Sequence, residues 1–463
     1  MTSFHVASRI LAGIALAAIA GLPACTVVDP HNMIGRQFGD ATAMPTEVVP
    51  SATRAPLSIA ERERAFDFVW RTINDRYHDA TLNGIDWNAT GSRYRPLAYA
   101  AKDDEAFWDV LDRMTGELKD AHTRVESPKR VELRKRDESV TLGIGFIPVE
   151  GKLAVSSVHP ESDAWWAGVR PGMTLVTIAG APAMQAYETL KADTRLDSTE
   201  RSRHLRAVRR LVTGELGSTV PFTFARGDGA QFDAVLSRRK VTARNFAVHR
   251  LLPSGYGYIR FTQWSLSLTT RAIETLEELI DTPGLIIDLR GNPGGSVHAV
   301  NLLLSKFFPV RTELGHATTR TGQPIAMLMG TVEIIKLKRT VDGDKNAYKG
   351  PVVILMNAQS ASGSELFAGT MQAAGRAVVA GEPSCGCLLG FLGYACVPGG
   401  AELAYSEIGF VMSNGKRIEG EGVIPDHLVG VTLADLQVNR DRALEEAQVI
   451  LRTLTAGSRQ PGV

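Results

Sequence analysis

The sequence predicts an α/β fold whose largest part, residues 244–435, alternates strands with helices. Short apolar runs typical of buried strands alternate there with amphipathic helical patterns. The strand-like runs lie at residues 256–261, 285–289, 352–356 and 377–380, and the helical patterns at 269–279, 297–308 and 364–374. This alternation is typical of α/β domains, whose sites lie at strand ends. Residues 311–350 contain few helical patterns, so we expect an inserted hairpin or lid.

The composition is that of a globular chain with several domains. The 463 residues are 44% hydrophobic, and 51 basic residues almost balance 50 acidic ones. This length allows about two to four domains with a sizeable core. The near-neutral charge and the lack of a basic block argue against a nucleic-acid partner.

The N-terminus is predicted to be a targeting segment. Arg9 precedes an apolar run at residues 10–22, which is too short to span a bilayer comfortably. The run leads into Leu-Pro-Ala-Cys25, which resembles the bacterial lipoprotein cleavage motif. Residues 1–24 would then be removed, and acyl chains on Cys25 would tether the protein to a membrane. The alternative is an ordinary secretory signal with an incidental cysteine.

The residue after the cysteine is Thr26 rather than Asp, which resembles the signal that sorts bacterial lipoproteins to the outer membrane. We therefore expect the protein in the bacterial cell envelope, facing the periplasm. Residues 25–57 lack periodicity and are expected to be a flexible linker.

Helical spacing predicts an N-terminal helical domain at residues 58–130. One apolar stripe runs between residues 59 and 79, and a second helix begins at Asp103 or Asp104. Residues 436–463 are expected to be a C-terminal helix and tail.

The chain between residues 138 and 232 is punctuated by glycines. A strand pattern leads into Gly143-Ile-Gly-Phe146, and residues 163–180 contain a short helix pattern, a turn and another strand. These features resemble a PDZ domain, which binds an extended C-terminus as an added strand and captures its carboxylate with loop N–H groups. The resemblance implies substrate binding by Gly143, Ile144, Gly145 and Phe146.

Ser362 is the first candidate for chemistry. The apolar strand at 352–356 is followed by three serines and a helical pattern, so Ser362 lies beside the unpaired N–H groups of a helix start. Nucleophilic serines occupy such places because a tetrahedral oxyanion needs donors. The alternative is a capping box formed by Ser362 and Glu365. If Ser362 is the nucleophile, Ser364 is available to cap the helix instead.

Three further segments carry candidate site residues. The strand at 285–289 enters a glycine turn whose N–H groups can approach a ligand, so Gly294 or Gly295 with Gly363 is expected to form an oxyanion hole. The turn does not have nucleotide-binding spacing. A helix end at residues 117–124 presents His122. A turn at residues 417–426 carries Glu419 and Glu421.

Together these motifs resemble the carboxyl-terminal processing (tail-specific) proteases and their tricorn-core relatives. The resemblance covers roughly residues 59–435 and is carried by the PDZ-like segment followed by LIIDLRGNPGG, SASGSE, GRAVVAGEP and IEGEGVIPD. It implies a crotonase-like α/β core, polypeptide substrates, no cofactor and a nucleophile at Ser362.

One position departs from the processing proteases, which use a Ser–Lys dyad. Cys387 stands where their lysine is expected, and a thiol is a poor replacement for a desolvated amine. The tricorn-like branch implies instead that His122 is the base and that Glu419 orients it, directly or through another side chain. In the Ser–Lys relatives the histidine is structural, so a structural His122 is the alternative.

The remaining cysteines are Cys385, Cys387 and Cys396. In an oxidising compartment a disulfide from Cys396 to one of the other two is expected. No histidine lies near the Cys-x-Cys pair in sequence, which argues against zinc, and no metal is expected.

The sequence therefore predicts a lipid-anchored serine endopeptidase that cleaves unfolded or C-terminally presented polypeptides through a Ser–His–Glu arrangement. A competing hypothesis is an inactive PDZ lipoprotein that binds protein C-termini as an adaptor or scaffold. Regulation by a disulfide beside the serine is compatible with the first hypothesis.

Overall fold

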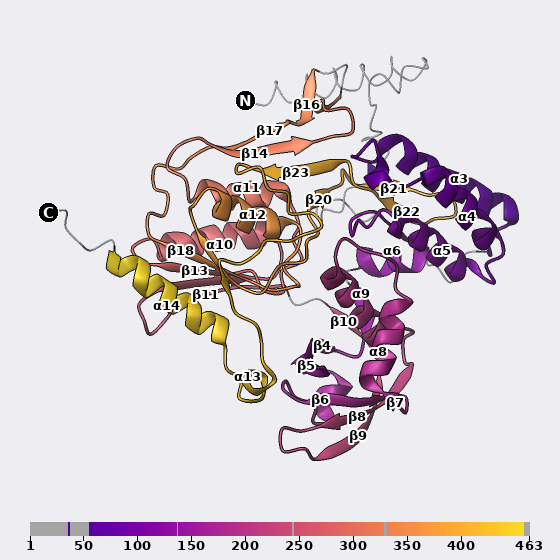
Figure 1. Ribbon diagram of the computed structural model, residues 1–463, viewed down its shortest axis with the longest axis horizontal. Coiled ribbons are helices and arrows are strands. Elements are labelled where there is room, and N and C mark those ends of the chain that lie inside the picture. Colours follow the sequence, from indigo (N-terminus) through magenta and orange to yellow (C-terminus); the bar gives the residue numbers. More distant parts are fainter. Residues whose placement is uncertain (1–35, 38–54, 137, 243–244, 328–330, 458–463) are drawn as a thin grey trace, which may run out of the picture.

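The computed structural model describes residues 36–37, 55–136, 138–242, 245–327 and 331–457 (Figure 1). The predicted signal peptide, Cys25 and most of the predicted linker lie outside the described residues. Within these ranges, no helix combines the length and the apolar character needed to cross a membrane.

A six-stranded sheet in the order β11-β12-β13-β18-β19-β24 forms the core (Figure 1). Its strands are β11 Ala247–Leu251, β12 Gly257–Phe261, β13 Leu285–Asp288, β18 Val352–Met356, β19 Val378–Gly381 and β24 His427–Leu428. The β11–β12 pair is antiparallel and all the other pairs are parallel. This is the α/β class that the sequence predicts.

Successive residues of the central strands face two different cores, which explains why these strands are apolar throughout. Ile287 packs in one core with the helices α10 Leu266–Glu278, α11 Val297–Ser305 and α12 Gly363–Ala373. Ile286 packs in the other with α14 Arg442–Gly457. The predicted C-terminal helix is thus a layer of the core, and the short α13 Leu433–Gln437 precedes it.

Residues 311–350 form the hairpin-like part of a second sheet. Its order is β17-β14-β23-β20, with β14 Thr312–Thr318, β17 Lys338–Val341, β20 Leu389–Gly390 and β23 Ile408–Met412. The separate pair β15 Ile325–Met327 and β16 Val332–Ile335 lies between β14 and β17 in the chain. Since β14 also pairs with β23, this region is part of the core rather than a detached lid.

The helices at the N-terminal end are α3 Ile59–Arg76, η2 Leu82–Gly84, α4 Trp87–Tyr99, α5 Asp104–Gly116 and α6 Pro128–Lys135. Ser58 begins α3 with a capping box, and Asp103 caps α5. Their apolar stripes do not form a core alone, because Leu403 and Tyr405 from the far end of the chain complete it. The supporting sheet has the order β1-β21-β22-β2, with β1 Arg36–Gln37, β21 Tyr394–Cys396, β22 Glu402–Ala404 and β2 Arg124–Glu126.

Residues 138–242 form a middle unit with a core of its own. Its sheet follows the order β4-β5-β6-β8-β9, with β7 beside β6, and β3 pairs with β10. The strands are β3 Glu138–Thr141, β4 Ile144–Val149, β5 Lys152–Val158, β6 Thr174–Ile178, β7 Ala181–Pro182, β8 Thr219–Ala225, β9 Gln231–Ser237 and β10 Arg239–Thr242. The helices are α7 Asp163–Trp166, α8 Ala183–Ala192 and α9 Glu200–Val212. The expected boundary at residue 232 falls inside β9.

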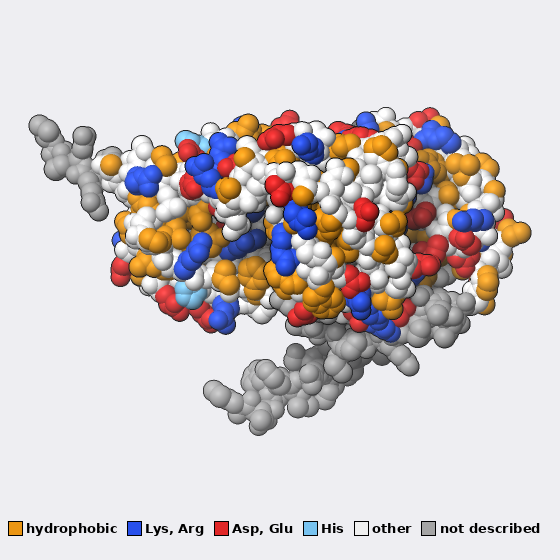
Figure 2. Space-filling view, turned by 90° about the horizontal axis from the view of Figure 1, so that it is seen from below, with side chains coloured by type: hydrophobic (Ala, Val, Ile, Leu, Met, Phe, Trp, Pro, Cys, Tyr) orange, Lys and Arg blue, Asp and Glu red, His pale blue; other side chains and the backbone are white. Residues whose placement is uncertain are grey.

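Seen from below, basic and acidic side chains are interspersed over the surface (Figure 2).

Candidate active site

Ser362 lies in the turn between β18 and α12, in a strained backbone conformation. Its φ is 51° and its ψ is −113°, which costs a non-glycine residue about 1–3 kcal/mol. Its N–H donates to Glu365 Oε2 at 2.9 Å and also lies 3.1 Å from the Cys387 carbonyl oxygen. Ser362 is the N-cap residue of α12, as the capping hypothesis expects, and it also has the strained strand–turn–helix geometry of nucleophilic serines.

Ser364 does not take over as the helix cap, contrary to expectation. Its hydroxyl donates to the Asn292 carbonyl at 2.9 Å and accepts from Trp264 Nε1 at 3.0 Å. Because Ser364 is already inside the first turn of α12, its side chain points at the glycine turn. Through the bond to Asn292, it links the start of α12, next to Ser362, to the glycine turn after β13.

His122 lies beside the serine hydroxyl. It comes from the loop between α5 and β2, 240 residues before Ser362, and its Nε2 is 3.2 Å from Ser362 Oγ. Both side chains are half-buried, so a substrate can reach them. The distance is within hydrogen-bond reach, which proton transfer requires.

The imidazole is poised to act as a base. Burial lowers the pKa of His122 below its ordinary value, against an opposing effect of Asp120 that raises it. The ring is therefore neutral near pH 7 and able to accept a proton. If the Ser362 hydroxyl donates to Nε2, the ring proton is on Nδ1. That atom is buried and has no hydrogen-bond partner among the described residues.

Glu419 lies nearby but makes no direct hydrogen bond to the imidazole. One carboxyl oxygen, Oε2, accepts the Leu388 N–H, while the buried Oε1 has no hydrogen-bond partner within the described chain. Burial, with a smaller contribution from the Asp120 charge, raises the pKa of Glu419 well above its usual range. The structure therefore shows no direct hydrogen bond by which Glu419 would orient the His122 ring.

Asp120 is a site residue that the sequence reasoning missed. It is fully buried, and its carboxyl accepts three hydrogen bonds: from the backbone N–H of His122 at 2.7 Å and from the hydroxyls of Thr123 and Ser406. Burial alone would raise its pKa, but the His122 ring and these donors outweigh burial and lower it. Asp120 is thus an ionised carboxylate next to the histidine. The Asp-x-His spacing was the available signal, but Ser406 lies too far along the chain to be foreseen.

Two of the three expected oxyanion donors are free. Within the described chain, the N–H groups of Gly295 and Gly363 have no acceptor. The N–H of Gly294 instead donates to Asn292 Oδ1 at 3.0 Å, which corrects its expected role. The backbone of Gly294 instead packs directly against the turn that carries Ser362. A Cβ at this position would lie 2.7 Å from Ser362 Cβ and from the Gly363 nitrogen. Any side chain at Gly294 would push on the nucleophile.

The disulfide joins Cys385 to Cys387, whereas we expected Cys396 to take part. Gly386, at φ +75°, turns the chain so that the two Cα atoms are 5.2 Å apart. Cys396 lies exposed on β21 as a free thiol, whereas Cys385 and Cys387 lie in the loop between β19 and β20. Cys387 therefore has no thiol to offer as a base in the position of the lysine.

Glu365 holds this disulfide loop against the serine turn. Its carboxyl accepts from the Ser384 hydroxyl and from the N–H groups of Gly386 and Cys387. Burial raises the pKa of Glu365 to about 7, although these hydrogen bonds act to lower it. Glu365, which the sequence analysis expected only as part of a helix cap, is a buried residue whose hydrogen bonds hold the loop that faces Ser362.

The predicted substrate-binding residues lie in the middle unit, and half of them are core. Ile144 and Phe146 are buried there, and Gly145 lies against Ser157 of the neighbouring strand. The Gly143 N–H donates to Thr141 Oγ1 at 3.3 Å. A hollow of about 340 Å³ adjoins this turn, lined by Thr141, Leu142, His159, Glu161, Ser162, Asp163, Ser237, Arg239, Lys240 and Val241.

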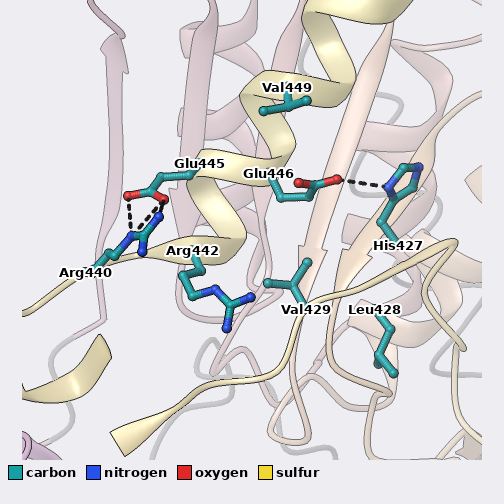
Figure 3. A pocket seen from close by; sticks show the side chains of 8 residues that line it. All are labelled: His427, Leu428, Val429, Arg440, Arg442, Glu445, Glu446 and Val449. Carbon is teal, nitrogen blue, oxygen red and sulfur yellow. Dashed lines mark hydrogen bonds and ion pairs between the residues drawn. The ribbon is translucent and has the colours of Figure 1, made fainter. Parts of the chain in front are cut away.

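A separate hollow of about 500 Å³ lies at the outer edge of the core sheet, beside β24 and α14 (Figure 3). His427 Nδ1 lies within hydrogen-bond distance of Glu446 Oε1, at 3.1 Å, and Arg440 forms an ion pair with Glu445. None of the predicted catalytic residues lines this hollow, so it does not identify the chemistry.

Comparison with known proteins agrees with this geometry. Residues 255–429 match the model of peptidase family S41, and residues 59–116 match that of the tricorn protease C1 domain. A carboxyl-terminal-processing protease of Synechocystis sp. is 25% identical over 417 residues, covering 88% of this chain and 90% of the relative. A tricorn protease homolog of Streptomyces coelicolor is 25% identical over 412 residues, covering 84% of this chain but 32% of the relative.

The fold is also similar to that of a solved structure. The structure of mature CPAF complexed with lactacystin superposes with a TM-score of 0.66 at 16% identity, covering 86% of this chain and 100% of that chain. At this identity the likeness shows the fold alone. The family models that match this chain and the curated relatives that it resembles are those of peptidases and proteases.

Proposed function

We propose that this protein is a serine endopeptidase in which Ser362 is the nucleophile and His122 the general base. The contact of 3.2 Å between Ser362 Oγ and His122 Nε2 carries the proposal. A purely structural histidine has no need to meet a strained serine from 240 residues away. The domain matches and the relatives favour the same chemistry.

The reaction follows from the geometry. The neutral imidazole takes the hydroxyl proton as Ser362 attacks the peptide carbonyl carbon. The oxyanion forms beside the free N–H groups of Gly295 and Gly363, which are already in place. His122 then returns the proton to the leaving amine, and water hydrolyses the acyl-enzyme by the reverse sequence.

Two carboxyl groups support the imidazolium in this proposal. Asp120 supplies negative charge beside His122: its carboxyl accepts the His122 backbone N–H at 2.7 Å, and its charge raises the pKa of the ring against burial. Glu419 presents a buried oxygen that has no hydrogen-bond partner within the described chain, and we assign it the third place in the Ser–His–Glu arrangement, acting on the ring without a direct hydrogen bond. Cys387 stands where the Ser–Lys relatives carry their lysine, and its disulfide with Cys385 leaves no thiol at that place, which supports histidine as the base.

The substrates we propose are unfolded or C-terminally presented polypeptides. The PDZ-like motifs of the middle unit support this class, as does the likeness to the carboxyl-terminal-processing protease of Synechocystis sp.. We further propose a crotonase-like core, a lipid anchor at Cys25 and a place in the bacterial cell envelope, on the sequence motifs described above.

The test is hydrolysis of a permanently unfolded protein, with the cut sites read by mass spectrometry. Ser362→Ala and His122→Ala should each lower the rate by at least about 10³-fold. His427→Ala, far from the site, is the matched control and should act like the wild type. Internal cuts are expected, as an endopeptidase requires.

Two results would contradict the proposal. Hydrolysis that survives His122→Ala would remove the histidine from the mechanism. A wild-type protein that hydrolyses nothing, yet binds C-terminal peptides at micromolar concentration, would favour the adaptor hypothesis.

A further inference from the structure

A buried serine joins the two turns that carry Ser362 and Glu419. Ser384 lies in the loop between β19 and β20, and its side chain is fully buried. Its hydroxyl accepts the N–H of Val423 at 2.7 Å and donates to Glu365 Oε1 at 2.5 Å. The Ser384 N–H donates in turn to the Val423 carbonyl at 3.2 Å. Since Val423 belongs to the turn of Glu419 and Glu365 to the first turn of α12, the hydroxyl links the two turns by direct hydrogen bonds.

The carboxyl group of Glu365 extends this link to the nucleophile. Its Oε2 accepts the backbone N–H of Ser362 at 2.9 Å and that of Cys387 at 3.0 Å. Its Oε1 accepts the Gly386 N–H at 2.6 Å in addition to the Ser384 hydroxyl. Each oxygen therefore accepts two hydrogen bonds, and the four donors together fix the orientation of the carboxylate.

Ser362 depends on this support because its backbone is strained. A φ of 51° in a non-glycine residue persists only where neighbouring groups hold it. The Ser362 N–H has two acceptors, Glu365 Oε2 and the Cys387 carbonyl oxygen at 3.1 Å. The backbone sets the direction of the Ser362 side chain, and with it the 3.2 Å contact between Oγ and His122 Nε2. A shift of the Glu365 carboxylate would therefore move the nucleophile relative to its base.

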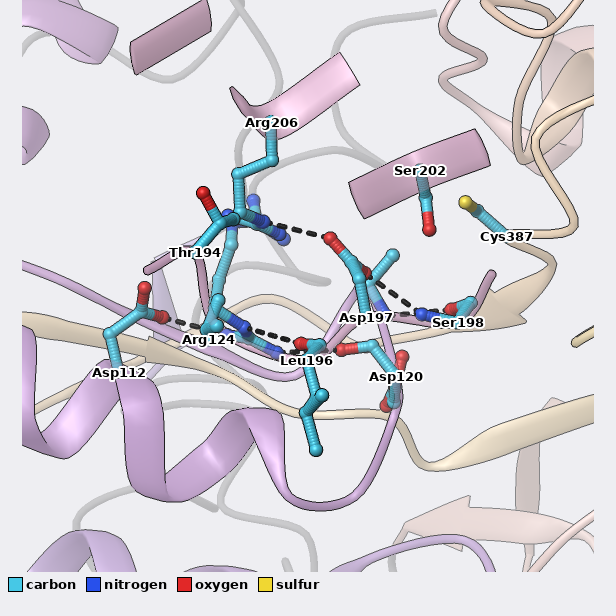
Figure 4. A network of polar contacts seen from close by, with 12 residues as sticks. Asp112, Asp120, Arg124, Thr194, Leu196, Asp197, Ser198, Ser202, Arg206 and Cys387 are labelled. Carbon is cyan, nitrogen blue, oxygen red and sulfur yellow. Dashed lines mark hydrogen bonds and ion pairs between the residues drawn. The ribbon is translucent and has the colours of Figure 1, made fainter. Parts of the chain in front are cut away.

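The middle unit holds Ser384 from the other side. Arg201, at the start of α9, donates to the Ser384 carbonyl at 2.6 Å and also to the Glu421 carbonyl. Figure 4 shows this meeting of the two parts, with Ser202 of α9 near Cys387 of the disulfide loop. With these contacts, the N–H, the hydroxyl and the carbonyl of Ser384 each have a partner.

We propose that Ser384 is a positioning residue of the catalytic centre, whose hydroxyl fixes the Glu365 carboxylate and thereby the backbone of Ser362. This inference rests on the proposed peptidase function, because it assigns Ser384 a role in the same reaction. Ser384 acts through Glu365 rather than on the reacting atoms. It also keeps the turn that carries Glu419 next to the helix that follows Ser362.

Ser384→Ala tests this role, since it removes the hydroxyl and adds no bulk. The Val423 N–H and the Glu365 carboxylate would each lose a partner. We expect kcat to fall by about 10- to 100-fold, the range for a lost hydrogen bond to a charged group. KM should stay within about 2-fold, because the change acts on the nucleophile and not on substrate binding. The reaction of Ser362 with a phosphonylating serine-hydrolase probe should slow by the same factor as kcat.

Ser127→Ala is the matched control. Ser127 is also buried, and its hydroxyl accepts the Arg130 N–H and donates to a carboxylate, that of Glu105, at 3.1 Å. It caps α6, however, and has no bond to the serine turn. This variant should lose stability in urea unfolding and keep kcat within about 2-fold. A loss of kcat that came from reduced stability alone would appear in both variants.

Glu365→Gln is a second variant, which keeps the volume of the side chain and replaces one acceptor oxygen with a donor amide. It should lower kcat at least as much as Ser384→Ala, with KM again within about 2-fold. In the Glu365→Gln background, Ser384→Ala should add less than about 2-fold, because the two side chains act as one unit. This double-mutant cycle separates action through Glu365 from simple support of the loop.

Three results would overturn the inference: a Ser384→Ala variant with the kcat of the wild type, a rise in KM in place of the fall in kcat, or effects of Ser384→Ala and Glu365→Gln that multiply. If Ser384→Ala does not fold, a Glu365→Gln variant with the kcat of the wild type overturns it as well. Each of these outcomes leaves an active wild type that depends on His122. Failure of the proposed function would look different, as a wild type without hydrolysis or an active His122→Ala variant.

Discussion

The nucleophile and the base of this site are held in opposite ways. Ser362 sits in one continuous stretch, where β18, the turn and α12 follow each other directly. His122 sits in a loop without regular structure, held by Arg195, Ser198 and Ser406, which lie far away in the sequence. The serine is placed mainly by local chain geometry, whereas the histidine depends on long-range contacts. Substitutions should therefore affect the two halves differently.

The largest effect is expected from Arg195→Ala. It removes two hydrogen bonds to carbonyl oxygens of the histidine loop and two to side chains of α5, and it leaves the buried Asp112 without its closest cation. We expect a loss of about 3–5 kcal/mol in the free energy of unfolding, as for other broken buried pairs, and little hydrolysis. Urea unfolding measures it.

The matched control is Arg113→Ala, which breaks the exposed pair with Asp193 and should cost about 0–1 kcal/mol. Equal stability of the two variants would show that the histidine loop does not depend on the middle unit.

Gly294→Ala tests how the local chain geometry places Ser362. The new Cβ would lie 2.7 Å from Ser362 Cβ and from the Ala361 carbonyl oxygen, at a φ of +100°. We expect about 1–3 kcal/mol of destabilisation and a kcat at least about 10-fold lower, since the nucleophile must shift.

Gly291→Ala controls for the positive φ alone, because a Cβ there meets only Gln359 at 3.6 Å. If both alanine variants keep the wild-type kcat, the close approach of Gly294 to the serine turn is irrelevant to the reaction.

A smaller effect is expected from Asp120→Asn. The Asp120 charge raises the pKa of His122 against burial, so its loss lets that pKa fall further. A base with a lower pKa stays unprotonated to lower pH, and the acid limb of the kcat/KM profile should move to lower pH. A shift to higher pH would contradict the charge assignment, and Glu446→Gln, at the outer edge of the sheet, should leave the profile in place.

The smallest effect is expected from Cys387→Ala. The disulfide encloses only Gly386, so its loss frees little chain entropy, and Glu365 still accepts both N–H groups of the loop. We expect most of the activity to remain and a stability change under about 2 kcal/mol, with Cys396→Ala as the control. A 100-fold loss of activity would make the disulfide part of the catalytic geometry.

The same division between local and long-range contacts explains what the sequence could predict. Strands such as β13 and the turn at Ser362 were visible because periodicity, glycines and serines are local signals. The packing of Tyr405 into the N-terminal helices, and of Ser406 against Asp120, joins segments almost 300 residues apart, which no periodicity reveals. The cysteine pairing was predicted wrongly because it depends on the turn at Gly386 and on the placement of Cys396 in β21, a strand of the sheet that supports the N-terminal helices.

The central claim is that Ser362 is a nucleophile activated by His122. Its most direct test is labelling of the native protein with a phosphonylating serine-hydrolase probe, followed by intact-mass and peptide mass spectrometry. The wild type should gain one adduct on Ser362, the Ser362→Ala variant none, and the His122→Ala variant should react at least about 10²-fold more slowly. An adduct on another residue, or an unchanged rate in His122→Ala, would contradict the account.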